Sequence, residues 1–386
     1  MSSYNLSYNK IKDAMSFCCD RIEQNLNVFT HIFPGPASVN NVYRTNENIG
    51  WTPGFWTGMH WLAYLHTKDA KFLRSAQIQC ESFRNRLVNN ISLEHHDIGF
   101  LYEYSCVNGY NITGDVEMKE TAIMAAEKLI TRFQEKGGFI QAWGELGKAE
   151  DYRLIIDCFL NLPLLFWASD ETKESKYYDI AYSHANAALD TVVRDDASTY
   201  HTYYFDNITG APLKGVTHQG YRDDSTWARG QAWAVYGLPL VYKYTGDDRF
   251  LKKSVPVTEY FLNSLPEDYV CYWDLSFKDG SNQVKDSSAA AIAVCGMMEA
   301  LKYLQDSETI EKYNYYIGRI LDSLIDNYTT KNIPGSNGIL AHGVYNWNKN
   351  LGVDECNLWG DYYFMEALSK ALKTQSNQLP EIANGL

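Results

Sequence analysis

Two acidic residues, Asp97 and Asp157, stand in settings where a carboxylate suggests chemistry. Asp97 ends the run Glu94-His95-His96-Asp97, and Asp157 interrupts the apolar stretch from Leu154 to Leu160, which we expect to be helical. A carboxylate in apolar surroundings loses hydration, which raises its pKa toward the range useful for proton transfer. The pair therefore predicts general acid/base catalysis.

Each acid also has a structural interpretation. Asp97 could instead cap the N-terminus of the helix that follows it, and Asp157 could be a buried acid paired with an arginine or a tyrosine. For Asp157 the catalytic interpretation is favoured, because an unpaired buried carboxylate is costly and is usually retained for function.

Arg229 and Trp233 are a second candidate pair, at the start of a predicted helix. They are four residues apart, which places a guanidinium and an indole ring on one helix face. This pairing suits a sugar that carries a carboxylate, bound by the arginine while its ring stacks on the tryptophan. The alternative is a salt bridge or cation–π contact inside the core.

The histidines give no sign of a metal centre. His201 and His218 lie in a segment expected to be a long loop and lack a ligand spacing such as H-x-x-x-H. We therefore expect neither a metal nor another cofactor.

Bulk composition excludes several classes of protein. A net charge of −13 argues against nucleic acid or an anionic membrane as a partner. The eight cysteines show no C-x-x-C spacing and are expected to be reduced. The N-terminus has no signal-peptide pattern, and no apolar run reaches the roughly 18 residues of a membrane span. We expect a cytoplasmic protein, monomeric or a weak homodimer.

Helical periodicity dominates the chain and predicts six helical hairpins. The predicted helices span 8–26, 54–66, 71–87, 98–110, 115–133, 154–168, 175–193, 227–244, 247–264, 288–304, 308–327 and 359–373. Apolar helices alternate with amphipathic ones, which predicts an inner ring covered by an outer ring, the all-α (α/α)6 toroid. The only extended stretch expected is 200–206, followed to about residue 222 by a loop or short hairpin over one mouth of the barrel.

The turns between helices carry a recurring signal. Thr67-Lys68-Asp69, Thr113-Gly114-Asp115 and Thr245-Gly246-Asp247 each predict that one helix ends and an aspartate caps the next, and Gln305-Asp306-Ser307 resembles them. No linker interrupts the pattern, so we expect one domain over 1–386, with its first helix from about residue 8 and a short flexible tail from about residue 375.

Nine blocks in order resemble the unsaturated glucuronyl hydrolases of glycoside hydrolase family 88. They are Trp51-Thr52-x-Gly54-Phe55-Trp56, His95-His96-Asp97-Ile98-Gly99-Phe100, Ile140-Gln141-Ala142-Trp143-Gly144, Ile155-Ile156-Asp157-Cys158-x-x-Asn161-Leu162-Pro163-Leu164, Tyr200-His201-Thr202, Thr217-His218-Gln219-Gly220, Ser225-Thr226-Trp227-x-Arg229-Gly230-Gln231-Ala232-Trp233, Asp286-Ser287-Ser288-Ala289 and Trp359-Gly360-Asp361-Tyr362-Tyr363. The blocks run from about residue 48 to 370, and the family's barrel agrees with the helix pattern.

The resemblance implies hydrolysis of oligosaccharides that carry a Δ4,5-unsaturated uronic acid at the non-reducing end, without a metal. It implies Asp157 as the general acid/base and Asp97 as its supporting carboxylate. The substrate-binding residues implied are Trp51, His96, His201, His218, Gln219, Arg229 and Trp233.

One departure from the family bears on specificity. Members that prefer sulfated glycosaminoglycan fragments carry Ser-x-x-Ser-x-Lys shortly before Gly352-Val353-Asp354-Glu355, and this chain has Asn346, Lys349 and Leu351 at those places. Fragments of unsulfated chondroitin or hyaluronan, or non-glycosaminoglycan fragments, are therefore the expected substrates. Rival interpretations are an unsaturated rhamnogalacturonyl hydrolase, a sugar 2-epimerase with paired histidines, and a non-catalytic carbohydrate-binding protein.

Overall fold

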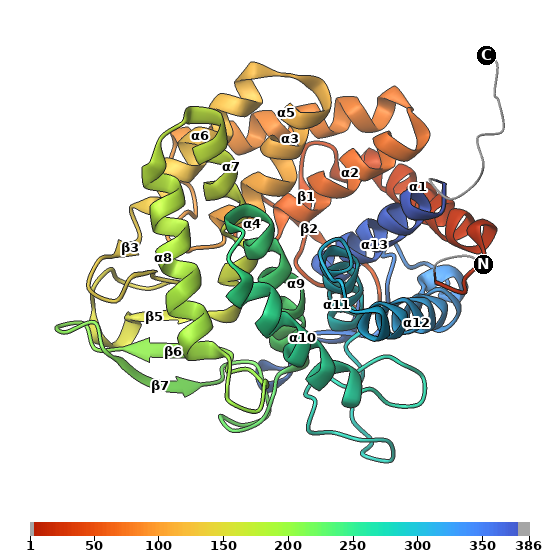
Figure 1. Ribbon diagram of the computed structural model, residues 1–386. Helices are drawn as coiled ribbons and strands as arrows, with labels where there is room; N and C mark the ends of the chain where they lie inside the picture. Colours follow the sequence, from red (N-terminus) through yellow and green to blue (C-terminus); the bar gives the residue numbers. More distant parts are fainter. Residues whose placement is uncertain (1–3, 377–386) are drawn as a thin grey trace.

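The computed structural model describes residues 4–376 and is built mainly of α-helices (Figure 1). An inner ring consists of helices that are buried on nearly all sides. In chain order these are α2 (Pro53–Thr67), α4 (Ile98–Tyr102) continued by the π-helical turn η1 (Glu103–Val107) and α5 (Asn108–Thr113), α7 (Pro163–Thr172), α9 (Ala228–Thr245), α11 (Ser287–Ala300) and α13 (Leu358–Ser376). Each contacts the next, and α13 packs against α2, so the ring is closed.

The outer ring consists of helices with one buried face. They are α1 (Tyr8–Phe29), α3 (Ala70–Val88), α6 (Val116–Ile130), α8 (Ser175–Val192), α10 (Asp248–Asn263) and α12 (Ser307–Ser323), which ends in the π-helical turn η4 (Leu324–Tyr328). Apart from the start of α7, the helices of both rings match the predicted segments closely. The predicted (α/α)6 toroid is confirmed.

The predicted helix-capping turns are present. The side chains of Asp69, Asp115, Asp247 and Asp306 each accept a hydrogen bond from a backbone N–H in the first turn of the next helix. In the first three turns the residue before the cap is in the left-handed conformation, with φ of 60° at Lys68, 74° at Gly114 and 66° at Gly246.

The helix predicted over 154–168 differs from the structure. Its first residues form strand β5 (Arg153–Ile155), a 3-10 turn η3 (Ile156–Leu160) follows, and α7 begins only at Pro163. Two β-branched isoleucines favour extended backbone at this point, and the proline suits the first turn of a helix. Asp157 therefore lies on a tight turn rather than inside an α-helix.

The expectation of a single extended stretch was also wrong. The predicted segment forms β6 (Thr202–Phe205), which pairs with β7 (Pro212–Val216) as a hairpin, and β5 adds a third strand on the other edge. Two-stranded pairs form elsewhere: β1 (Phe33–Pro34) with β2 (Thr45–Asn46), β3 (Phe133–Gln134) with β4 (Phe139–Ile140), and β8 (Gly343–Asn346) with β9 (Leu351–Glu355). Most of these strands are only two residues long and give no alternating pattern.

The structure also bears on the predictions about the cysteines, membrane-spanning helices and the C-terminal tail. All eight cysteines are free and buried, as predicted. Across residues 4–376, no helix has both the length and the apolar character needed to cross a bilayer. The helix α13 continues to Ser376, so the predicted tail from about residue 375 lies almost wholly outside the described residues.

Candidate active site

A cavity of about 190 Å³ lies where the N-terminal ends of inner helices meet the loops that precede them. It is lined by eight of the nine predicted site residues: Trp51, His96, Asp97, Asp157, His201, Gln219, Arg229 and Trp233. The ninth, His218, is exposed, and its ring packs against Trp143 in the cavity wall. Residues from separate blocks of the sequence thus converge on one pocket.

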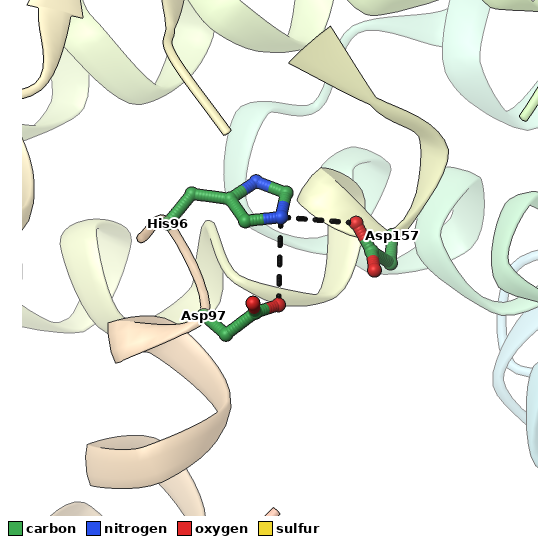
Figure 2. A group of neighbouring side chains, drawn as sticks. All are labelled: His96, Asp97 and Asp157. Atoms are coloured by element: carbon green, nitrogen blue, oxygen red, sulfur yellow. Dashed lines mark ion pairs between the residues drawn. The ribbon is translucent and has the colours of Figure 1, made fainter. Parts of the chain in front are cut away.

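His96 stands between the two acids (Figure 2). Its Nε2 atom is 3.4 Å from Oδ1 of Asp97 and 3.3 Å from Oδ1 of Asp157. The neighbouring His95 contributes a second contact, from Nδ1 to Oδ2 of Asp97 at 3.3 Å. The two carboxylates therefore share one buried imidazole.

Local structure directs Asp97 into this cluster. It immediately precedes α4, but its side chain makes no capping hydrogen bond, so the alternative interpretation of Asp97 as a helix cap is wrong. The carboxylate accepts instead from Nδ2 of Asn161 at 3.4 Å. A Cβ atom at Gly99 would collide with the backbone of Asn161, so glycine permits the close approach of these segments.

The two acids have opposite pKa shifts. Burial, together with the negative charge of Asp97, raises the pKa of Asp157, although His96 opposes the change. Burial also acts to raise the pKa of Asp97, but the nearby His96 and His95 and the hydrogen bond from Asn161 outweigh it, and the net pKa is lowered. The pKa of Asp157 is thus raised, as the sequence predicted, while that of Asp97 is lowered.

His96 responds to both acids. Its burial alone would lower its pKa, but the charges of Asp97 and Asp157 reverse the effect, and the net pKa is raised. Both ring nitrogens of His96 and Oδ1 of Asp157 are buried without a well-aligned hydrogen-bond partner. Such atoms in a cavity are typical of a site that awaits a ligand.

The same cluster could also hold a cation. One donor atom from each of His96, Asp97 and Asp157 lies within 4.8 Å of the others. The set also suits proton transfer, because the pKa values of its two carboxyls are displaced in opposite directions.

Arg229 differs from its predicted environment. Its guanidinium lies over Trp227 at 4.4 Å and over Trp359 at 4.7 Å, rather than beside Trp233. Nη1 donates to Asp286 at 3.1 Å and to the carbonyl of Val344. This corresponds to the alternative interpretation, a salt bridge with cation–π contacts, although Arg229 also lines the cavity.

The second guanidinium nitrogen fixes the cavity wall. Nη2 of Arg229 donates to Oε1 of Gln219 at 2.6 Å and to the carbonyl of Tyr345 at 2.8 Å. Gln219 therefore accepts from Arg229, which leaves its amide N–H groups free to donate to a ligand. Of the five guanidinium N–H donors, only that on Nε has no partner.

Aromatic rings form much of the remaining wall. Trp51 stacks on Trp359 at 4.8 Å and donates from Nε1 to the hydroxyl of Tyr345 at 3.0 Å. Trp233 packs against Phe100 at 5.4 Å. These contacts fix the rings, so the wall offers rigid faces to a flat ligand.

His201 is held in one tautomer. Burial lowers its pKa well below the usual value, so the ring is neutral. Its Nδ1 accepts a hydrogen bond of 2.9 Å from the backbone N–H of His218, which leaves Nε2 as the donor.

Sequence reasoning missed Trp143, Ile155, Trp227 and Tyr345, which also line the cavity. The two tryptophans lie within motif blocks, a signal that could have identified them. Ile155 looked like helix core, and Tyr345 lies in a hairpin that the sequence did not predict.

The chain forms a closed ring of helix pairs, and at one mouth of the ring lie two carboxyl groups whose pKa values are shifted in opposite directions. These features define a class, the helical-toroid sugar hydrolases. Comparison with known proteins gives the family. The sequence model of Glycosyl Hydrolase Family 88 matches residues 34–374, and the chain belongs to that family.

Individual relatives support the same family assignment. The unsaturated chondroitin disaccharide hydrolase of Streptococcus pneumoniae is 51% identical over 369 residues, which cover 95% of this chain and 93% of the relative. The unsaturated glucuronyl hydrolase of Bacillus sp. GL1 is 39% identical over 347 residues, which cover 89% and 92%. The crystal structure of unsaturated glucuronyl hydrolase from Streptococcus agalactiae matches with a TM-score of 0.93 and 50% identity, covering 94% and 92%.

These similarities confirm the family resemblance and the enzyme class predicted from the sequence. They favour a glucuronyl hydrolase over the rhamnogalacturonyl hydrolase and the sugar 2-epimerase.

Proposed function

We propose that this protein removes the Δ4,5-unsaturated uronic acid from the non-reducing end of lyase-generated oligosaccharides. The observation that carries the proposal is the opposite displacement of the pKa values of Asp157 and Asp97 in one cavity. A variant of the S. agalactiae enzyme has been crystallised in complex with dGlcA-GalNAc6S, a ligand of the same class.

Asp157 begins the reaction as a protonated acid. It donates its proton to C4 of the C4=C5 double bond, and the π electrons form the new C4–H bond. Positive charge develops at C5 and is shared with the ring oxygen. The raised pKa of Asp157 keeps the proton available for this step.

Water then attacks C5. The ionised Asp157 accepts the proton that this water loses, which restores the acid. The hemiketal at C5 opens to a ketone as the bond from C5 to the ring oxygen breaks, and that oxygen becomes the hydroxyl of a hemiacetal at C1. The hemiacetal then collapses to an aldehyde: its hydroxyl oxygen forms the C1=O double bond, the glycosidic bond breaks, and the leaving sugar takes up the proton and departs as an alcohol. Because the anomeric carbon is not attacked, the distance rule for retaining and inverting glycosidases does not apply.

The other site residues orient the sugar. Asp97 stays ionised and accepts from a sugar hydroxyl, while His96 lies against both carboxylates. Gln219 and His201 donate to oxygen atoms of the substrate, and Trp51 and Trp233 pack against its ring. Arg229 acts mainly by fixing Gln219, and His218 by setting the tautomer of His201.

The test is to incubate the protein with an unsaturated glycosaminoglycan disaccharide and follow the ultraviolet absorbance of the conjugated alkene. Hydration of the double bond removes the absorbance, whereas epimerisation or simple binding leaves it unchanged. In heavy water, deuterium should appear at C4. Persistent absorbance with every unsaturated uronide tested would refute the proposal.

We further propose that the chain works as one catalytic domain, in the cytoplasm, as a monomer or weak homodimer. The closed contact between α13 and α2 and the eight free cysteines support this view. Size-exclusion chromatography with light scattering tests the oligomeric state, and cell fractionation tests the location.

A further inference from the structure

Four aromatic side chains cluster on the surface beside the catalytic cavity. They are Tyr221, Trp273, Phe277 and Trp347, which we call the aromatic platform. Trp347 stacks on the buried Trp273 with ring centroids 5.2 Å apart and planes at 15°. Phe277 lies 5.5 Å from Trp273 and 5.0 Å from Tyr221. The cluster mixes one core ring with three that reach solvent.

These rings are exposed where burial would be expected. Tyr221 is 50% exposed, and Trp347 and Phe277 are partly exposed. A contiguous exposed aromatic patch on a soluble protein is typical of a binding surface. Flat rings of this kind pack against the C–H faces of pyranose sugars.

The platform is held in place by hydrogen bonds that join its segments. The buried carboxylate of Asp274 accepts from the backbone N–H of Tyr221 at 2.9 Å and from the hydroxyl of Ser225 at 2.7 Å. At the tip of the β8–β9 hairpin, Asn348 donates to the carbonyl of Gly220 at 2.9 Å. A preordered surface loses less conformational entropy when a ligand binds.

The platform is continuous with the cavity. Gln219 and Tyr345 line the cavity, and Tyr221 and Trp347 each follow one of them by two residues. Because Asn346 is extended, the side chains of Tyr345 and Trp347 lie on the same side of the chain. The loops after β7 and after α10, green and teal in Figure 1, lie on the same side of the toroid.

We propose that the aromatic platform binds the leaving portion of the substrate beyond its first sugar, so that the enzyme favours unsaturated oligosaccharides longer than a disaccharide. This inference rests on the proposed function, because the catalytic cavity is expected to take the unsaturated uronic acid itself. The expected occupant is the second or third sugar from the cleaved bond, stacked between Trp347 and Tyr221.

The experiment compares an unsaturated hyaluronan disaccharide with the corresponding tetrasaccharide. Wild-type protein should show kcat/KM about tenfold higher for the tetrasaccharide, which corresponds to about 1.4 kcal/mol. In Trp347→Ala and Tyr221→Ala the ratio should fall toward one, mainly through KM of the tetrasaccharide. Trp347→Tyr should keep most of the preference, because it retains a ring.

Tyr315→Ala is the matched control. Tyr315 is 46% exposed, and its ring packs on Tyr269 and Tyr316 rather than on the platform. It should leave the substrate ratio unchanged. An equal kcat/KM for both substrates in wild-type protein, or an equal loss for both in the platform variants, would overturn the inference.

A binding measurement separates this inference from the proposed function. Calorimetric titration of Asp157→Asn with both oligosaccharides should give about tenfold tighter binding of the tetrasaccharide, and Trp347→Ala in that background should abolish the difference. If wild-type protein hydrolyses neither substrate, the proposed function fails, and the titration still decides whether the platform binds the longer chain.

Discussion

Asn161 donates a hydrogen bond from Nδ2 to Oδ1 of Asp97, at 3.4 Å. The same amide donates to the backbone carbonyl of Asp157 at 3.4 Å, and its Oδ1 accepts from the N–H of Phe100 at 2.8 Å. Asn161 therefore ties the start of α4 to the turn that carries the second acid. One side chain thus holds both the carboxylate of Asp97 and the backbone of Asp157.

We expect Asn161→Ala to lower kcat about tenfold, because misplaced catalytic groups lose rate steeply. The variant also leaves a buried N–H of Phe100 unpaired, which should cost about 1–3 kcal/mol of unfolding free energy. Asp97 loses a hydrogen bond that lowers its pKa, so the acidic limb of the kcat/KM profile should move to higher pH. Urea unfolding and the pH profile measure the two effects.

Asn25→Ala is the control for Asn161→Ala. Asn25 lies on α1, is also buried, and donates from its side chain to the carbonyl of Asn337 at 2.7 Å; it does not line the cavity. It should lose stability without any shift in the pH profile. A purely structural role for Asn161 would make the two variants behave alike.

Asp157→Asn should abolish turnover with a much smaller loss of binding, because the amide cannot protonate C4. Asp97→Asn should also be severely damaging. Measurements of kcat and of substrate affinity distinguish the two effects. If Asp157→Asn retained more than about a tenth of the wild-type kcat, its contribution would be below about 1.4 kcal/mol, and its assignment as the acid would be wrong.

The fold was largely predictable because its determinants are local. Helix periodicity, the Thr-Gly-Asp turns and the alternation of apolar and striped helices all depend on neighbouring residues. The turn at Asp157 was not predictable in this way, because β5 forms only when β6, nearly 50 residues later, pairs with it. The two-residue strands are likewise fixed by tertiary contacts.

The site was predictable in its members but not in their contacts. The motif blocks contain both acids and most of the cavity wall. The side-chain environment of Arg229 depends on Asp286 and on carbonyls of β8, which are distant in sequence, so helical spacing suggested the wrong aromatic partner. The contacts of His96 with the two acids likewise form only when the ring of helices closes, so they could not be predicted from the sequence.

Chelation should not affect the reaction. His96, Asp97 and Asp157 lie close enough to share a cation. The proposed mechanism, however, uses the carboxyl group of Asp157 as proton donor and acceptor and includes no metal. We expect kcat in excess EDTA to match kcat in untreated buffer, with glycosaminoglycan disaccharide as substrate. Loss of activity that returns on adding a divalent metal would show that the cluster is a metal site.

Sulfated substrates should be poorer than unsulfated ones. Asn346 is buried, its Oδ1 accepts from the backbone N–H of Lys349, and its amide carries no charge to attract a sulfate. Leu351 is 46% exposed and offers no charge. We expect kcat/KM for an unsulfated chondroitin disaccharide to exceed that for its 6-sulfated form.

A charge introduced at residue 351 tests the same idea. Leu351→Lys should raise kcat/KM for the 6-sulfated disaccharide several-fold at low salt, and the gain should shrink as salt increases. Leu351→Gln is the matched neutral variant and should leave the preference unchanged. A wild-type preference for the sulfated disaccharide would contradict the expectation.

The two acids should set opposite limbs of the pH profile. Asp157 must be protonated, so kcat/KM falls as pH rises through its raised pKa. Asp97 must be ionised, so kcat/KM falls as pH drops through its lowered pKa. His96 is the strongest influence that lowers each of these pKa values against burial, and its removal should raise both.

In His96→Gln we therefore expect a lower kcat and a movement of both limbs to higher pH. The measurement is kcat/KM against pH for wild-type and variant protein with one disaccharide substrate. His31→Gln, which changes an exposed histidine just after α1, should leave both limbs in place. An alkaline limb that stayed fixed or moved to lower pH in His96→Gln would show that His96 does not control the proton on Asp157.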